Sequence, residues 1–222
     1  VSNALAQIQA EDINPVSPLY AIVDTGTVGL VGHSFGGAAG LYASAVDGCA
    51  AAPIPPFCDN PFTNPYTRPA GLKAAVFYGT NLVAPPPLPP IVTNLNTSGV
   101  AVTLMQGTLD GVATLQKAEQ TYPTLEEPRG LITINGANHY GICDVNNPGP
   151  PIPPPPGFFP PVPQPDLSQP TFTPQDESYT RVARWTNLWL RAHLRNDPLA
   201  QWWIYQAEGS LDEVVEVCTE DL

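Results

Sequence analysis

The sequence has few charged residues, and basic residues are the scarcest among them. Only 13% of the 222 residues are charged, and 8 Lys and Arg stand against 20 Asp and Glu, which gives a formal net charge of −12. A chain this acidic repels phosphate backbones and anionic lipid, so we expect no nucleic-acid partner. The most apolar stretch, residues 28–52, is mostly Gly, Ala and Ser and carries His33 and Asp47. We therefore predict a soluble protein with no membrane span.

Signatures of metal and nucleotide sites are also missing. The three histidines lack the spacing of a metal cluster, which argues against a zinc hydrolase, and we predict no metal. No phosphate-binding P-loop is present, and the spacing of Gly36, Gly37 and Gly40 does not match the dinucleotide pattern G-x-G-x-x-G. We therefore expect no cofactor.

The four cysteines include no Cys-x-x-Cys pair, which disfavours a zinc ribbon or a thioredoxin-type site. Their even number is compatible with two disulfides, and we prefer to pair Cys49 with Cys58 and Cys143 with Cys218. The longer loop would contribute about 4 kcal/mol to stability. Disulfides predict a secreted or periplasmic protein. Four buried thiols in a cytosolic protein are the alternative.

Proline, in contrast, is abundant, with 29 residues concentrated in two tracts. The tracts are residues 84–91 and 147–174. Because proline cannot donate a backbone hydrogen bond, we expect both to run as polyproline II or irregular surface loops. A ligand for an SH3-type partner is the alternative interpretation.

The rest of the chain alternates short apolar runs with helical stretches, which is typical of a parallel sheet with crossover helices. We predict strands at residues 28–32, 72–79, 100–107 and 131–135. We predict helices at residues 3–13, 35–45 and 112–122, from residue 176 onward, and after the Asp197-Pro198 pair. The helix from residue 176 places Val182, Trp185, Trp189 and Ala192 on one apolar stripe. The sequence therefore predicts a single α/β domain over residues 1–222.

One motif carries chemistry at the end of the first predicted strand. Residues 32–36, Gly-His-Ser-Phe-Gly, follow that strand and open a helix, which is the context that the G-x-S-x-G nucleophile elbow requires. Glycines suit this turn because it is so sharp that neighbouring side chains would collide. The backbone N–H of Phe35 would point at an oxyanion forming beside Ser34, so we predict Phe35 as an oxyanion-hole donor. A glycine-rich turn packed for its own sake is the alternative.

A nucleophilic serine needs a base, and the base needs an acid that orients it. Asp110 and His139 each follow a later predicted strand, and the carboxyl ends of parallel strands gather at one edge of a sheet. We therefore predict a catalytic triad of Ser34, Asp110 and His139. In the alternative interpretation, Asp110 is a helix N-cap and Asp144 or Asp24 is the acid. Neither Asp144 nor Asp24 fits the chain order that accompanies such an elbow, in which the acid lies between the nucleophile and the base.

These residues resemble the α/β-hydrolase superfamily, through GHSFGG at residues 32–37, an Asp after the next-but-one strand, and ANHYG at residues 137–141. The GHSFGG sextet is similar to the elbows of platelet-activating-factor acetylhydrolases, dienelactone-hydrolase-like proteins, chlorophyllases and cutinase-type polyester hydrolases. The resemblance implies that Ser34 is the nucleophile, His139 the general base and then acid, and Asp110 its orienting carboxylate. The implied reaction is acyl transfer to water through an acyl-enzyme.

The resemblance covers only the C-terminal half of the family's fold, because a complete member has further strands before the elbow strand. We therefore expect the elbow strand to be a sheet edge with unpaired backbone groups. We favour a truncated sequence; self-association, another chain or a minimal version of the fold are the alternatives. In the family, the missing half supplies a second oxyanion donor, whose loss would cost about 2.7 to 4 kcal/mol of transition-state stabilisation.

The loops bear on the substrate. Residues 80–99 are too few for a large helical lid, so we expect a cleft open to bulky, lipid-like or polyester substrates. We predict that His33, Phe158 and Phe159 contact the substrate, the two phenylalanines as one wall of a pocket. An ordinary packed His33 and an ordinary surface loop are the alternatives. The predicted function is a serine carboxylic-ester hydrolase; a peptide- or amide-cleaving enzyme and a catalytically silent binding protein are the alternatives.

Overall fold

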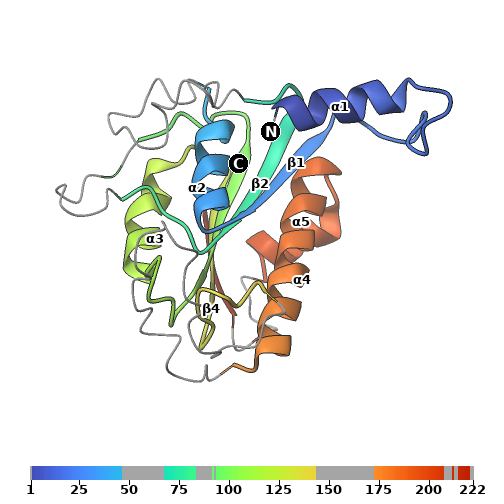
Figure 1. Ribbon diagram of the computed structural model, residues 1–222. Helices are drawn as coiled ribbons and strands as arrows, with labels where there is room; N and C mark the ends of the chain where they lie inside the picture. The colour runs from blue at the N-terminus through green and yellow to red at the C-terminus, as the bar shows by residue number, and fades with distance from the viewer. Residues whose placement is uncertain are drawn as a thin grey trace, which may run out of the picture.

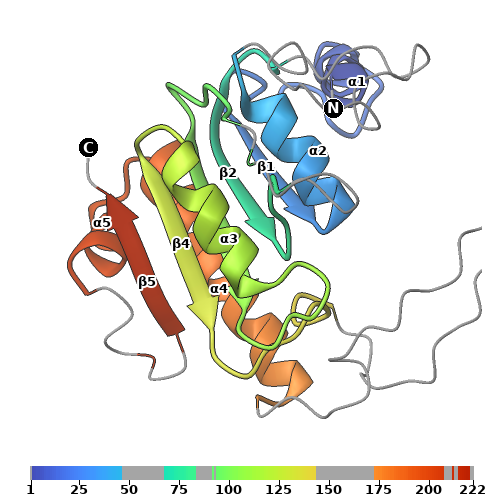
Figure 2. The ribbon, with the colours of Figure 1, turned by 90° about the vertical axis from the view of Figure 1, so that its left-hand side faces the viewer.

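Four apolar runs form the parallel strands of one sheet. The computed structural model describes residues 2–46, 68–83, 92, 94–143, 173–207, 212 and 215–220. The parallel strands are β1 (Val28–His33), β2 (Leu72–Tyr78), β3 (Ala101–Gly107) and β4 (Arg129–Ile134). The four strands pair in chain order, and each pair is parallel. In Figure 2, the arrowheads of β1, β2 and β4 point to the same end of the molecule. The predicted α/β class with a mostly parallel sheet and flanking helices is confirmed.

A fifth strand, β5 (Val215–Glu220), completes the sheet and was not predicted. It runs antiparallel to β4, as the opposed arrows in Figure 2 show. Val215 and Val217 are buried, whereas Glu216 and Cys218 are exposed. This alternation with period two is the pattern of a strand that is covered on one face only.

At the other end of the strand order, β1 is an edge of the sheet. Within the described residues it pairs only with β2, and the side chain of Val31 is 54% exposed. The expectation that the elbow strand lies at an edge is confirmed.

Helices cover both faces of the sheet (Figure 1). One face carries α2 (Phe35–Ser44) and α3 (Leu115–Thr121), with the 3-10 turn η2 (Tyr122–Thr124) after α3. The other carries α4 (Gln175–Leu194) and α5 (Pro198–Tyr205), whereas α1 (Ser2–Asp12) projects away from the end of the sheet. The helix predicted after the Asp197-Pro198 pair is α5, and Asp197 caps it, because its side chain accepts hydrogen bonds from the N–H groups of Leu199 and Ala200.

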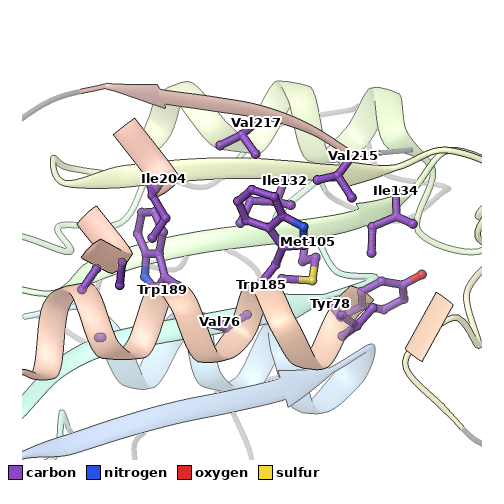
Figure 3. Packing of buried hydrophobic residues seen from close by; sticks show 14 of the residues in the cluster. Val76, Tyr78, Met105, Ile132, Ile134, Trp185, Trp189, Ile204, Val215 and Val217 are labelled. Atoms are coloured by element: carbon purple, nitrogen blue, oxygen red, sulfur yellow. The ribbon is translucent and has the colours of Figure 1, made fainter. Parts of the chain in front are cut away.

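The core beneath α4 is built on the predicted apolar stripe. Val182, Trp185, Trp189 and Ala192 are all buried, and both indole rings are at most 1% exposed. Figure 3 shows the two tryptophans between α4 and the side chains of Met105, Ile132 and Val217. Truncation of either tryptophan to Ala would cost about 3–5 kcal/mol. This layer therefore fixes α4, whose first residues lie beside the loop that follows β4.

The opposite core lies beneath α2 and α3. Leu41, Phe77 and Leu104 are among its fully buried members. A Cβ atom at Gly40 would come within 2.2 Å of the Phe77 ring, so glycine lets α2 lie directly on β2. This close approach fixes the start of α2, where Ser34 lies.

The predicted bridge between Cys143 and Cys218 does not form. Cys218 lies on β5 opposite Leu131, in the middle of β4, whereas the Cys143 carbonyl accepts a hydrogen bond from Gln175 at the start of α4. Cys218 thus lies within the sheet, whereas Cys143 lies in the loop that follows β4. Cys49, Cys58, the tract 84–91 and residues 147–172 of the second tract lie outside the described residues, and secretion stays a prediction. No helix in the described part of the chain is both long and apolar enough to span a bilayer.

Candidate active site

Ser34 lies on the turn between β1 and α2, in a backbone conformation that L residues rarely adopt. Its φ is 54° and its ψ is −123°. The turn is held by its neighbours, since the Ser34 N–H donates to the Tyr78 carbonyl at 2.9 Å and the Ala38 N–H donates to the Ser34 carbonyl at 3.0 Å. This strained turn places the serine hydroxyl beyond the end of the sheet.

Glycine is required at some positions of this turn and not at others. A Cβ at Gly32 would lie 2.8 Å from the carbonyl oxygen of Gly36, and one at Gly37 would lie 2.9 Å from Thr80 Cγ2. A Cβ at Gly36 would meet no atom within 4 Å. The predicted steric need for glycine is confirmed at residue 32 and wrong at Gly36, because that side of the turn is open; Gly37, the next residue, also requires glycine.

Asp110 follows β3 and is 3% exposed. Its Oδ1 accepts hydrogen bonds from the backbone N–H groups of Val112 and Ala113, both at 2.8 Å. Its Oδ2 accepts from Gln106 Nε2 at 2.9 Å and from His139 Nδ1 at 2.8 Å. Four donors therefore satisfy a buried carboxylate, which is the condition under which burial of a charge is tolerated.

His139 follows β4 and joins Asp110 to Ser34. The imidazole is 4% exposed, and its Nε2 lies 2.9 Å from Ser34 Oγ. Because a carboxylate only accepts hydrogen bonds, Nδ1 of His139 is the donor to Asp110, and Nε2 faces the Ser34 hydroxyl as a possible acceptor of its proton. The structure thus brings the three predicted residues into one continuous hydrogen-bonded chain.

The loop that carries His139 is tied down on both sides. Asn138 is fully buried, and its Oδ1 accepts from the Tyr140 N–H at 2.9 Å while its carbonyl accepts from the Gly141 N–H at 3.0 Å. Gln175, at the start of α4, donates through Nε2 to the carbonyls of Tyr140 and Cys143. The position of the imidazole is therefore set by the fold.

Sequence reasoning gave Gly79 no role in this site. Gly79 follows β2 with φ +61°, and a Cβ there would lie 3.0 Å from His139 Nδ1 and 3.1 Å from Asp110 Oδ2. The backbone at Gly79 therefore lies directly against the Asp110–His139 hydrogen bond. A glycine at the end of an apolar strand was the available signal, but it was interpreted only as a strand end.

Phe35 is the first residue of α2, so its backbone N–H lies at the positive end of the helix dipole. Its ring is 63% exposed. Leu109 and Val112, which flank Asp110 in the chain, are 37% and 38% exposed. Apolar side chains are thus exposed next to two of the three triad residues.

The other predicted candidates lie elsewhere or outside the described residues. Asp24 lies before β1, at the opposite end of that strand from Ser34, and it accepts a hydrogen bond from the Gly26 N–H. Asp110 is not a helix N-cap, because the residue in that position of α3 is Thr114. Asp144, Phe158 and Phe159 lie outside the described residues.

The two remaining histidines have different surroundings. His193 lies on α4, where its ring is 4.5 Å from that of Trp189 and its Nε2 is 3.0 Å from the Tyr205 hydroxyl; burial lowers its pKa to about 4. It is therefore a histidine packed against the aromatic side chains of α4 and α5. His33 Nε2 lies 2.8 Å from the His139 carbonyl. Its contact in the structure is therefore with the loop that carries His139, and its predicted substrate contact stays a prediction.

In the described part of the chain, no three His, Cys, Asp or Glu side chains lie close enough together to hold a metal ion. No protein-family model matches the chain, and no curated protein matches it either.

Proposed function

We propose that this chain is a serine carboxylic-ester hydrolase that acts through an acyl-enzyme, on a scaffold corresponding to the C-terminal half of an α/β-hydrolase fold. The observation that carries the proposal is the hydrogen-bonded chain from Ser34 Oγ through His139 to Asp110, which begins on a strained strand-to-helix turn. This is the arrangement that nucleophilic catalysis by serine needs, because an unassisted hydroxyl is a weak nucleophile.

In the first half-reaction, Ser34 Oγ attacks the ester carbonyl carbon while His139 Nε2 takes the hydroxyl proton. The carbonyl oxygen becomes an oxyanion, for which the N–H of Phe35 is the proposed donor. The imidazolium then gives its proton to the alkoxy oxygen as the C–O bond breaks, so the alcohol leaves and the acyl group stays on Ser34. Asp110 stabilises the imidazolium without taking its proton.

In the second half-reaction, water replaces the alcohol. His139 Nε2 removes a proton from the water as its oxygen attacks the acyl carbon, and the same proton returns to Ser34 Oγ when the acyl-enzyme bond breaks. The products are the carboxylic acid and the restored serine. No other protein group has to change its protonation state.

Bulky or polymeric esters with an apolar acyl part are the proposed substrate class. The support is the exposure of the Phe35 ring and of Leu109 and Val112, together with the empty space beside Gly36. Apolar side chains next to a nucleophile favour apolar acyl groups, because each buried CH₂ contributes about 0.8 kcal/mol.

The test is steady-state hydrolysis of matched p-nitrophenyl esters and p-nitroanilides, with acyl chains of increasing length. We expect turnover of the esters, a kcat/KM that rises with chain length, and loss of roughly 10⁴-fold or more in kcat for Ser34→Ala. Ser98→Ala is the matched control, because Ser98 is an exposed serine that precedes β3, at the opposite end of the sheet. Faster cleavage of the anilides would favour an amide-cleaving enzyme, and turnover of neither would favour a binding protein.

A further inference from the structure

Two side chains hold consecutive backbone carbonyls of the loop that carries His139. The Tyr78 hydroxyl donates to the carbonyl of Asn138 at 2.6 Å. His33 Nε2 lies 2.8 Å from the carbonyl of His139 itself. Neither side chain touches Ser34 Oγ or Asp110 in these contacts, so both act on the base through its backbone.

The sheet register places these two side chains together. His33, the last residue of β1, and Tyr78, the last residue of β2, are paired in the parallel ladder. Paired residues of parallel strands point to the same face, and the two ring centroids are 5.9 Å apart. Figure 3 shows Tyr78 at one end of the apolar cluster, with its hydroxyl directed away from the other labelled side chains. The strand ends therefore present two polar groups beside one loop.

The chemistry of each contact is defined by its acceptor. A carbonyl oxygen only accepts hydrogen bonds, so Nε2 of His33 is the donor and carries a proton. Burial lowers the pKa of the His33 imidazole, against a smaller opposing effect of its hydrogen bond to the His139 carbonyl. Its ring centroid lies 4.8 Å from that of His139. A neutral ring at this distance donates its hydrogen bond without opposing the positive charge that forms on His139 during catalysis.

We propose that His33 and Tyr78 are positioning residues, which together clamp the backbone of residues 138 and 139 and so hold the His139 imidazole between Ser34 and Asp110. The inference rests on the proposed function and goes beyond it, since it assigns a role in the reaction to two side chains outside the triad. Small displacements of a catalytic group lower the rate steeply, which is why a two-point restraint on the backbone matters for catalysis.

The test compares variants that lose one donor with a variant that restores it. His33→Phe keeps a ring but removes the donor, whereas His33→Gln keeps an amide N–H for the carbonyl of His139. Tyr78→Phe removes only the hydroxyl, and Tyr179→Phe is its control because it removes a hydroxyl that is partly exposed on α4. The double variant His33→Phe/Tyr78→Phe removes both bonds.

Two measurements are made on each variant: kcat and KM for an alkyl ester and a p-nitrophenyl ester of the same acid, and hydrogen exchange of the peptide covering residues 137–143. We expect each Phe variant in the clamp to lose about fivefold in kcat, and the double variant about 10²-fold, with KM within twofold. The loss is larger for the alkyl ester, because its leaving group depends more on a well-placed acid. We expect His33→Gln to recover at least half of the rate, and exchange to be faster only where a donor is lost.

The outcomes separate this proposal from the proposed function. A wild-type chain that hydrolyses neither ester contradicts the proposed function. An active wild type whose clamp variants keep full kcat, or whose loop exchanges no faster, overturns the positioning role. Equal losses on both esters, with no recovery by His33→Gln, also overturn it, because that pattern indicates general destabilisation.

Discussion

The two sides of the candidate site differ in how fully the described chain surrounds them. On the base side, Asp110 and His139 are 3% and 4% exposed, and the carboxylate accepts four hydrogen bonds. On the nucleophile side, the Phe35 ring is 63% exposed, and a Cβ at Gly36 would meet nothing within 4 Å. The comparison teaches that packing and hydrogen bonds fix Asp110 and His139, whereas space is left beside Ser34, on the side where the proposed acyl group would lie.

The sharpest way to break the base side is Asp110→Asn. The amide is nearly isosteric, but its NH₂ group cannot accept from His139 Nδ1–H, so the imidazole adopts the wrong tautomer for accepting the serine proton. We expect kcat for ester hydrolysis to fall by about 10⁴-fold. The measurement is steady-state turnover beside Asp24→Asn, an exposed aspartate at the other end of β1. A variant that keeps a tenth of the wild-type kcat would rule out the proposed role of Asp110.

A smaller perturbation of the same side is Gly79→Ala. The new methyl group would lie 3.0 Å from His139 Nδ1 at a φ of +61°, so it strains the backbone and pushes on the Asp110–His139 bond. We expect a loss of about 10²-fold in kcat. Gly99→Ala is the matched control, because it has a φ of +77° and its methyl would meet only Arg68 Nη2, at 3.6 Å.

Both glycine variants should lose similar stability, of about 1–3 kcal/mol, because both carry the strain of a positive φ. Gly79→Ala should lose much more of its kcat than the control Gly99→Ala. Equal rates in the two variants, measured well below their unfolding temperatures, would show that the contact with the triad does not matter.

The weakest expected effect contrasts two glycines of the elbow. Gly32→Ala would bring a methyl within 2.8 Å of the Gly36 carbonyl, and we expect it to lower the free energy of unfolding by about 1–3 kcal/mol. The methyl group of Gly36→Ala would meet no atom within 4 Å, and residue 36 lies within α2. Because alanine favours the helix more than glycine does, we expect this variant to raise the free energy of unfolding by up to about 1 kcal/mol. Urea unfolding of both variants checks the pair. Strong destabilisation by Gly36→Ala would show that the nucleophile side is closed.

The parallel strands and the triad were predictable for a physical reason. Strands covered on both faces are continuous apolar runs, and parallel strands bring their carboxyl ends to one edge, so Ser34, Asp110 and His139 had to lie close together once the order of the strands was known. Their hydrogen bonds have the geometry that this argument implied.

Features that depend on contacts between distant segments were not predictable. β5 alternates Val with Glu and Cys along a half-covered strand, a weak signal beside the apolar runs. α3 begins at Leu115 instead of residue 112, because Asp110 Oδ1 holds the N–H groups of Val112 and Ala113 in a turn. The predicted bridge between Cys143 and Cys218 is wrong because an even number of cysteines does not say where the fold places them.

The central claim is that His139 activates Ser34, and the most direct test is the intact mass of the chain before and after treatment with a fluorophosphonate. Stable phosphonylation needs an activated serine, so we predict one adduct on the wild type and on Ser98→Ala, and none on Ser34→Ala. A wild-type chain that stays unmodified, or an adduct that persists in Ser34→Ala, would contradict the account.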